Sequence, residues 1–127
     1  MSIVIVAAAV LTLAAIAPSL RAEPATGQFK ATAYCSCSKC CGKLAEGITA
    51  SGKRVHWGMI AADWSVLPPG TRVGLSCFPR QVFVVEDRGG AIKGKRIDVW
   101  YPSHRSALKF GVHGKIQIKI LPDPHVH

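Results

Sequence analysis

The sequence has few acidic residues: Asp and Glu together number 7, against 16 Lys plus Arg, which gives a formal net charge of +9. Aromatic residues make up only 7% of the chain, and the basic residues are scattered rather than gathered in one run. Nucleic-acid-binding proteins more often combine clustered basic residues with stacking aromatics, so we expect no nucleic-acid partner. The positive charge instead favours an anionic polymer of the cell envelope as the partner, or serves solubility alone.

The chain also lacks a hydrophobic run that would cross a membrane comfortably. Its longest apolar stretch, residues 3–17, is shorter than the roughly 20 residues that a spanning helix needs. This stretch is typical of a secretory signal, and Ala22 offers a small residue for cleavage. Only the α-amino group supplies positive charge ahead of the stretch, so a retained N-terminal anchor stays open as an alternative. We expect residues 1–22 to be a signal peptide and the protein to be secreted or periplasmic, without a stable membrane span.

Long linkers, internal repeats and low-complexity segments are missing as well. The 127 residues suffice for one domain, which we expect to cover residues 23–127, with a core over about 28–121 and a short tail at 122–127. A domain of this size lies near the small end of stable folds, which disfavours a multidomain enzyme and a large cofactor-binding fold. We expect no cofactor, and we expect the protein to be a monomer.

The remaining pattern indicates β-structure. Short apolar or alternating segments, separated by Gly and Pro turn signals, predict strands at 29–34, 58–62, 72–75, 81–86, 96–100 and 115–121. One helix is predicted over 103–110, with Ser103 as its N-cap and Gly111 as its stop. Several short strands and one short helix favour an all-β fold, a small barrel or a sandwich.

Cysteine is abundant for such a short chain. The cysteines are Cys35, Cys37, Cys40, Cys41 and Cys77. In a small exported protein they indicate disulfides, and we expect Cys77 to form a disulfide with one cysteine of the CSCSKCC cluster, in a pairing that the sequence does not specify. Four thiolates can also form a zinc site, but the spacing in CSCSKCC is unlike the usual paired zinc knuckles, so we expect no metal. Because five is odd, at least one thiol is unpaired or intermolecular.

Three of the four aspartates stand at the end of an apolar strand segment or inside one: Asp63, Asp87 and Asp98. An ionised carboxylate is costly there unless it is paired or lies at a functional opening, and a raised pKa suits a general acid. Each aspartate also has a structural interpretation. Asp63 can cap the turn that follows it, Asp87 can open the glycine turn after it, and Asp98 can form a salt bridge within its strand.

Five motifs in order, ATAYCSC, GITASGK, GMIAAD, LPPGTRV and VVEDRGGAIKGKRIDVW, resemble the three-aspartate (3D) domain family. The likeness runs from about residue 30 to residue 121, and its most specific part is the DRGGAIKG loop with a second Asp eleven residues after the first. This family includes the catalytic barrel of lytic transglycosylase A and small stationary-phase survival and cell-wall proteins. The resemblance implies a six-stranded double-psi β-barrel with one short helix, and peptidoglycan glycan strands as the ligand.

The resemblance further implies a lytic transglycosylase that breaks MurNAc–GlcNAc bonds and forms a 1,6-anhydro product, with Asp98 as its single catalytic acid and base. Asp87 would orient the substrate and raise the pKa of Asp98 by like-charge proximity. The expected substrate-binding residues are Asp63, Thr49, Ser51, Gly89, Gly90, Lys93, Trp100 and Tyr101. The two aromatic residues can stack on sugar rings, although a place in the small core is the more frequent outcome for each.

Two other functions stay open. The larger transglycosylases of the family have a second domain that helps to form the substrate groove, and we expect none in 127 residues. A non-catalytic polysaccharide-binding module of the expansin type is therefore the alternative. A third interpretation is a structural envelope protein held by disulfides or a metal, in which the aspartates only cap turns.

Overall fold

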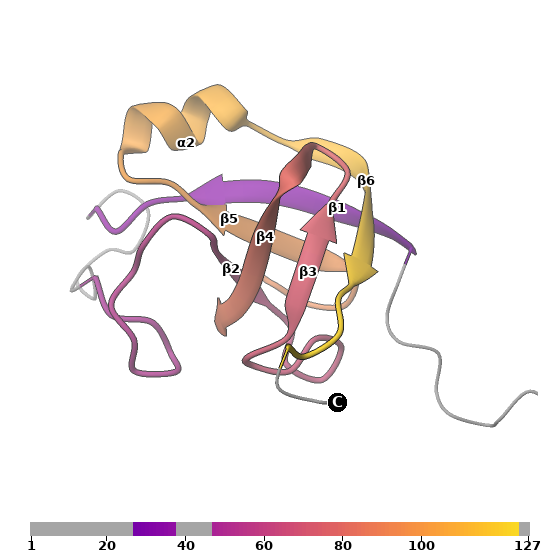
Figure 1. The fold of residues 1–127 in the computed structure, drawn as a ribbon. Coiled ribbons are helices and arrows are strands. Elements are labelled where there is room, and N and C mark those ends of the chain that lie inside the picture. The colour runs from indigo at the N-terminus through magenta and orange to yellow at the C-terminus, as the bar shows by residue number, and fades with distance from the viewer. Residues whose placement is uncertain (1–26, 38–46, 125–127) are drawn as a thin grey trace, which may run out of the picture.

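The computed structural model describes residues 27–37 and 47–124 of the chain (Figure 1). The expected signal peptide, Cys40 and Cys41, and the end of the expected tail lie outside the described residues. The described elements are β1 Gly27–Tyr34, β2 Met59–Ala62, β3 Arg72–Leu75, β4 Phe78–Asp87, β5 Arg96–Trp100, α2 His104–Phe110 and β6 His113–Ile120. No helix in this part of the chain is both long and apolar enough to cross a membrane.

The strands close into a barrel in the order β1-β5-β2-β4-β3-β6. The pairs β1–β5 and β2–β4 are parallel, whereas the other neighbouring pairs are antiparallel. Closure leaves no sheet edge with unpaired backbone groups, which a small β-protein must otherwise protect. The expected fold class, an all-β six-stranded barrel with one short helix, is confirmed.

Side-chain alternation along each strand separates the core from the outer face of the barrel. In β5, Ile97 and Val99 are fully buried, while Arg96, Asp98 and Trp100 point outward and are half-buried. The largest fully buried side chains of the barrel are Phe29, Phe83, Met59, Ile60, Leu67, Leu75, Ile97, Val73, Val85 and Val99. Burial of such apolar surface is the main favourable term in folding. It fixes the register of β5, and with it the outward position of Asp98.

The helix forms where the capping residues predict it. Ser103 accepts a hydrogen bond from the backbone amide of Ser106, whose side chain in turn accepts from the Ser103 backbone, so the two form a capping box. Gly111 ends the helix with a φ of 70°, a conformation that favours glycine. Ala107 is buried, and α2 packs against β1 (Figure 1).

The strand β4 differs from its expected bounds because it begins at Phe78 rather than at residue 81. Phe78 pairs with Leu75 across a tight connection, and an irregularity in the register between Gly74 and Leu75 accommodates the turn. The start of β4 at Phe78 was not predicted from the sequence because Pro79 follows it, and proline is disfavoured inside a sheet.

Candidate active site

Strand pairing places Asp87 and Asp98 on either side of β2. Ala61, in β2, pairs with Asp98 in β5 and with Asp87 in β4. Neighbouring strands lie about 4.8 Å apart, so the two aspartate backbones are separated by about 10 Å across β2. Two acids that stand 11 residues apart in the sequence thus belong to one region of the barrel surface.

Asp98 lies half-buried on the outer face of β5. The hydroxyl of Thr32, the residue paired with Asp98 on β1, donates a hydrogen bond to Asp98 Oδ1 at 3.0 Å. Burial raises the pKa of Asp98 above its usual value; the Thr32 hydrogen bond and the Arg96 charge oppose the rise, and the Asp87 charge adds to it. A carboxyl with this balance is suited to hold a proton and to release it.

Asp87 ends β4 and is held by three donors. Tyr34 Oη donates to Asp87 Oδ2 at 2.8 Å, and the backbone amides of Ala50 and Arg88 donate to Oδ1, each at 2.9 Å. The indole Nε1 of Trp64 donates to the Asp87 backbone carbonyl at 3.0 Å. Both the carboxylate and the backbone of Asp87 are therefore fixed in position.

The loop that contains Thr49 and Ser51 is anchored by Glu86, which is only 5% exposed. Ser51 Oγ donates to Glu86 Oε2 at 2.8 Å, and Lys53 Nζ donates to Oε1 at 3.1 Å. The two hydroxyl oxygens of Thr49 and Ser51 lie 2.9 Å apart, and the Lys53 amide donates to the Thr49 hydroxyl at 3.1 Å. These hydroxyls bind within the protein and position the loop whose Ala50 amide reaches Asp87.

Asp63 follows β2 and organises two loops. Its Oδ1 accepts from the Ser65 amide at 3.0 Å and from the Ser65 hydroxyl at 2.7 Å, while Oδ2 accepts from the Gly94 amide at 2.9 Å. These hydrogen bonds, with the Gly94 amide first, lower the pKa of Asp63 to about 2. The arrangement matches the turn-capping interpretation of Asp63, and substrate contact by this residue stays a prediction.

A shallow hollow lies beside Asp87. It is lined by Ala50, Arg88, Gly89, Gly90 and Lys93, so three of the residues expected to bind substrate line one surface depression. A side chain at Gly90 would meet nothing within 4 Å, whereas a Cβ at Gly89 would come within 3.3 Å of Ile92 Cγ1. Gly90 thus leaves the hollow open, and Gly89 allows the close packing of Ile92 beneath the loop.

The two aromatic residues that follow Asp98, Trp100 and Tyr101, lie in different surroundings. Trp100 shares the outer face of β5 with Asp98, and its Nε1 donates to Ser36 Oγ at 2.9 Å. Tyr101 packs edge-on against Trp57 and next to Phe110, with ring centroids 5.1 and 5.4 Å away, and burial raises the pKa of its hydroxyl. Trp100 therefore remains available to a ligand on the Asp98 face, while Tyr101 belongs to an aromatic cluster.

The cysteines do not form the expected link to Cys77 among the described residues. Cys77 is a half-buried free thiol, whose pKa is raised by burial. The Sγ atoms of Cys35 and Cys37 lie 2.8 Å apart, farther than the roughly 2.05 Å of a disulfide bond. Pairings that involve Cys40 or Cys41 lie outside the described residues and stay predictions.

Three neighbours of the aspartates were not identified from the sequence: Thr32, Tyr34 and Glu86. Thr32 and Tyr34 stand two residues apart on β1, so they share a face, and the alternation of residues 29–34 contained that signal. Only the pairing of β1 with β5 shows that this face meets Asp98. The sequence feature that could have identified Glu86 is weaker: it is an acidic residue next to Asp87 at the end of an apolar strand.

Comparison with known proteins identifies the family. The sequence profile of the 3D domain matches residues 58–122, which is just over half of the 127 residues. The chain belongs to the 3D domain family. It is 35% identical over 105 residues to YabE of Bacillus subtilis (strain 168), a protein named for cell wall shaping, in a match that covers 80% of this chain and 25% of YabE.

A second relative and two solved structures extend the comparison. The cell wall-binding protein YocH of B. subtilis (strain 168) is 37% identical over 79 residues, which are 59% of this 3D domain chain and 26% of YocH. The chain thus spans about a quarter of the length of these curated relatives. Two crystal structures of MltA from E. coli, the second with bound chitohexaose, are 25% and 26% identical to this chain. Each has a TM-score of 0.46, and the matches cover 58% and 59% of this chain and 28% of MltA.

Proposed function

We propose that this 3D domain protein acts outside the cytoplasm and cleaves the glycan strands of peptidoglycan as a lytic transglycosylase. The observation that carries this function is the setting of Asp98, a half-buried carboxyl with a raised pKa on the outer face of the barrel. Asp87 and the hollow beside it lie on the other side of β2 from Asp98. The cell-wall names of YabE and YocH support the substrate class.

One carboxyl group suffices for this reaction. Thr32 donates to Asp98 Oδ1, so Oδ2 is the oxygen that carries the catalytic proton. Asp98 gives that proton to the glycosidic oxygen as the bond from this oxygen to C1 breaks. The Asp98 carboxylate then takes the proton of the C6 hydroxyl, O6 bonds to C1, and the 1,6-anhydro ring closes with Asp98 protonated again. Hydrolases instead need a second carboxylate to activate water or to form a covalent intermediate.

The surrounding residues bind and orient the glycan. Asp87 is fixed by Tyr34 and two backbone amides, and its charge contributes to the raised pKa of Asp98. Gly90 allows a sugar ring to approach the loop closely, and Lys93 offers a cation to a substrate carboxylate or carbonyl in the same hollow. Trp100 supplies an aromatic surface on the Asp98 face.

The test is a digest of purified sacculi, analysed by mass spectrometry, with the wild type, Asp98→Asn and Asp123→Asn. Asp123 is an exposed acid beyond the last strand, so its variant is the matched control. We expect 1,6-anhydro muropeptides from the wild type and from Asp123→Asn, and none from Asp98→Asn, which should still fold and pellet with sacculi. Equal cleavage by Asp98→Asn would remove Asp98 from the mechanism.

A non-catalytic wall-binding module is the second candidate function. It is favoured by the internal hydrogen bonds of Thr49, Ser51 and Asp63, which leave a shallow hollow rather than a deep groove. This function predicts that the wild type pellets with sacculi, releases no muropeptides, and is unaffected by Asp98→Asn in every wall assay.

Export is part of the proposal. Residues 1–22 would be removed as a signal peptide, and the barrel would act as a monomer. The intact mass of the protein recovered from the cell envelope or medium checks the first point, and sedimentation checks the second. A mass that retains residues 1–22 would point to an N-terminal anchor instead.

A further inference from the structure

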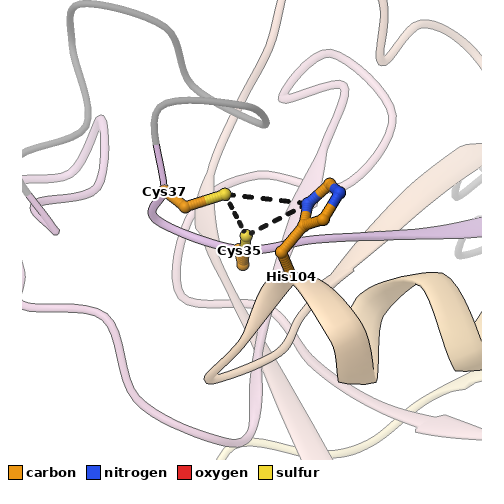
Figure 2. Close-up of side chains that lie close together, drawn as sticks. All are labelled: Cys35, Cys37 and His104. Carbon is orange, nitrogen blue, oxygen red and sulfur yellow. Dashed lines mark hydrogen bonds between the residues drawn. The ribbon is translucent and has the colours of Figure 1, made fainter.

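Two cysteines and a histidine meet at one end of the barrel. Cys35, just after β1, is 1% exposed, Cys37 follows two residues later, and His104 is the first residue of α2. His104 Nδ1 lies 3.9 Å from Cys35 Sγ and 3.7 Å from Cys37 Sγ (Figure 2). Their ligand atoms all lie within 4.8 Å of one another, although the histidine is more than 60 residues away in the sequence.

We propose that Cys35, Cys37 and His104 bind a metal ion, with Zn²⁺ as the ion that fits best. Thiolate and imidazole are the ligands that zinc prefers in proteins, and neither magnesium nor calcium favours sulfur. Among the described residues these three ligands leave one position of a tetrahedral site for a further ligand. The proposal of this site does not rest on the proposed glycan cleavage, because none of its three residues is given a role in that chemistry.

The geometry fits zinc after one small adjustment. Zinc bonds of about 2.3 Å to sulfur and about 2.0 Å to nitrogen, at tetrahedral angles, separate sulfur from nitrogen by about 3.5 Å and the two sulfurs by about 3.8 Å. The two sulfur–nitrogen distances, 3.7 and 3.9 Å, are close to this value. The two sulfurs, at 2.8 Å, must move apart. Cys37 is half-buried and lies outside regular secondary structure, so a rotation of its side chain can provide that movement.

A bound metal would stiffen the edge of the candidate active site. Ser36, between the two cysteines, accepts a hydrogen bond from Trp100 Nε1, and Tyr34, just before Cys35, donates to Asp87. The metal would join this segment to the start of α2. It would therefore restrain the residues that hold Trp100 and Asp87 in place, as a structural zinc site does.

The first test is metal content. The full chain is purified without chelator or reductant, and zinc is measured by elemental mass spectrometry in the wild type, Cys37→Ser and His104→Gln, with Cys77→Ser and His113→Gln as matched controls. We expect about one zinc per chain in the wild type and in both controls, and less than about a tenth of that in Cys37→Ser and His104→Gln. Full zinc content in His104→Gln would exclude the imidazole as a ligand and overturn the site.

Two measurements on the unmutated protein keep the test decisive if a variant fails to fold. X-ray absorption of the zinc-loaded protein should show sulfur and imidazole nitrogen in the first coordination shell, and Co²⁺ in place of zinc should give a thiolate-to-cobalt charge-transfer band. A first coordination shell of oxygen alone would overturn the proposal. The absence of the thiolate-to-cobalt charge-transfer band would overturn it as well. The proposal would also be overturned if peptide mapping finds a Cys35–Cys37 disulfide in the purified protein and the reduced protein then takes up no metal.

Discussion

Replacing Thr32 by valine should destabilise the protein more at neutral pH than at acidic pH. The Thr32 hydroxyl donates to Asp98 Oδ1 at 3.0 Å, and valine keeps the shape of threonine but lacks the donor. A hydrogen bond to a charged group contributes about 1.5–3 kcal/mol, and one between neutral groups about 0.5–1.5 kcal/mol. The free energy of unfolding should fall by the larger amount where Asp98 is ionised and by the smaller amount where it is protonated.

The sign follows from linkage. The pKa of Asp98 is already raised, mainly by burial, so its ionisation weakens the fold as pH rises through that pKa. The Thr32 bond favours the ionised form, and its loss should raise the pKa further. The stability of Thr32→Val should therefore fall more steeply with rising pH than that of the wild type.

The assay is urea unfolding of both proteins at a series of pH values from acid to neutral. Thr71→Val is the matched control, because the Thr71 hydroxyl donates at 2.6 Å to the uncharged carbonyl of Pro68, and its loss should not depend on pH. A Thr32→Val effect that is flat with pH, or larger in acid, would refute the idea that this hydroxyl stabilises the Asp98 carboxylate.

Three further predictions concern carboxyl groups. The pKa of Asp63 is lowered from 3.8 to about 2, so Asp63→Asn should lose stability at neutral pH, and its melting temperature should approach that of the wild type as pH falls toward 2; a constant difference would contradict this. Glu86→Ala leaves the Ser51 hydroxyl without its acceptor and should lower the free energy of unfolding by about 1–3 kcal/mol. The exposed Gln117→Ala should change it by less than about 0.5 kcal/mol, and equal losses would argue against the Glu86 anchor. Glycan cleavage should slow as pH rises through the raised pKa of Asp98, and a rate that is flat with pH would exclude its role as general acid.

The strands and the helix were largely predictable because local patterns determine them. The alternation that buries Ile116 and Ile118 identified β6, and Ser103 with Gly111 marked the ends of α2. The start of β4 was not predictable, since Pro79 argues against a strand until the pairing of Leu75 with Phe78 is known. Strand order could come only from the family resemblance, because no local pattern encodes which distant strands pair.

The acidic residues of the candidate site could be predicted from the sequence, whereas their hydrogen-bond partners could not. Asp87 and Asp98 stood out because charged groups are depleted in apolar strands. The donor to Asp98, Thr32, lies 66 residues away, and such a contact exists only after β1 pairs with β5. The contact between His104 and Cys35 was not predictable for the same reason, because these residues lie 69 positions apart in the sequence and meet only in the folded chain. For Asp63 the open alternative, a turn cap, is what the structure shows.

The most direct test of the central claim is to digest sacculi in water enriched in the heavy oxygen isotope. If Asp98 both donates the proton and lets the C6 hydroxyl attack C1, the products must be 1,6-anhydro muropeptides that carry no heavy oxygen at C1. We expect that result from the wild type, with no product from Asp98→Asn. Reducing-end products labelled at C1 would show that water is the nucleophile, and would contradict the single-carboxyl mechanism.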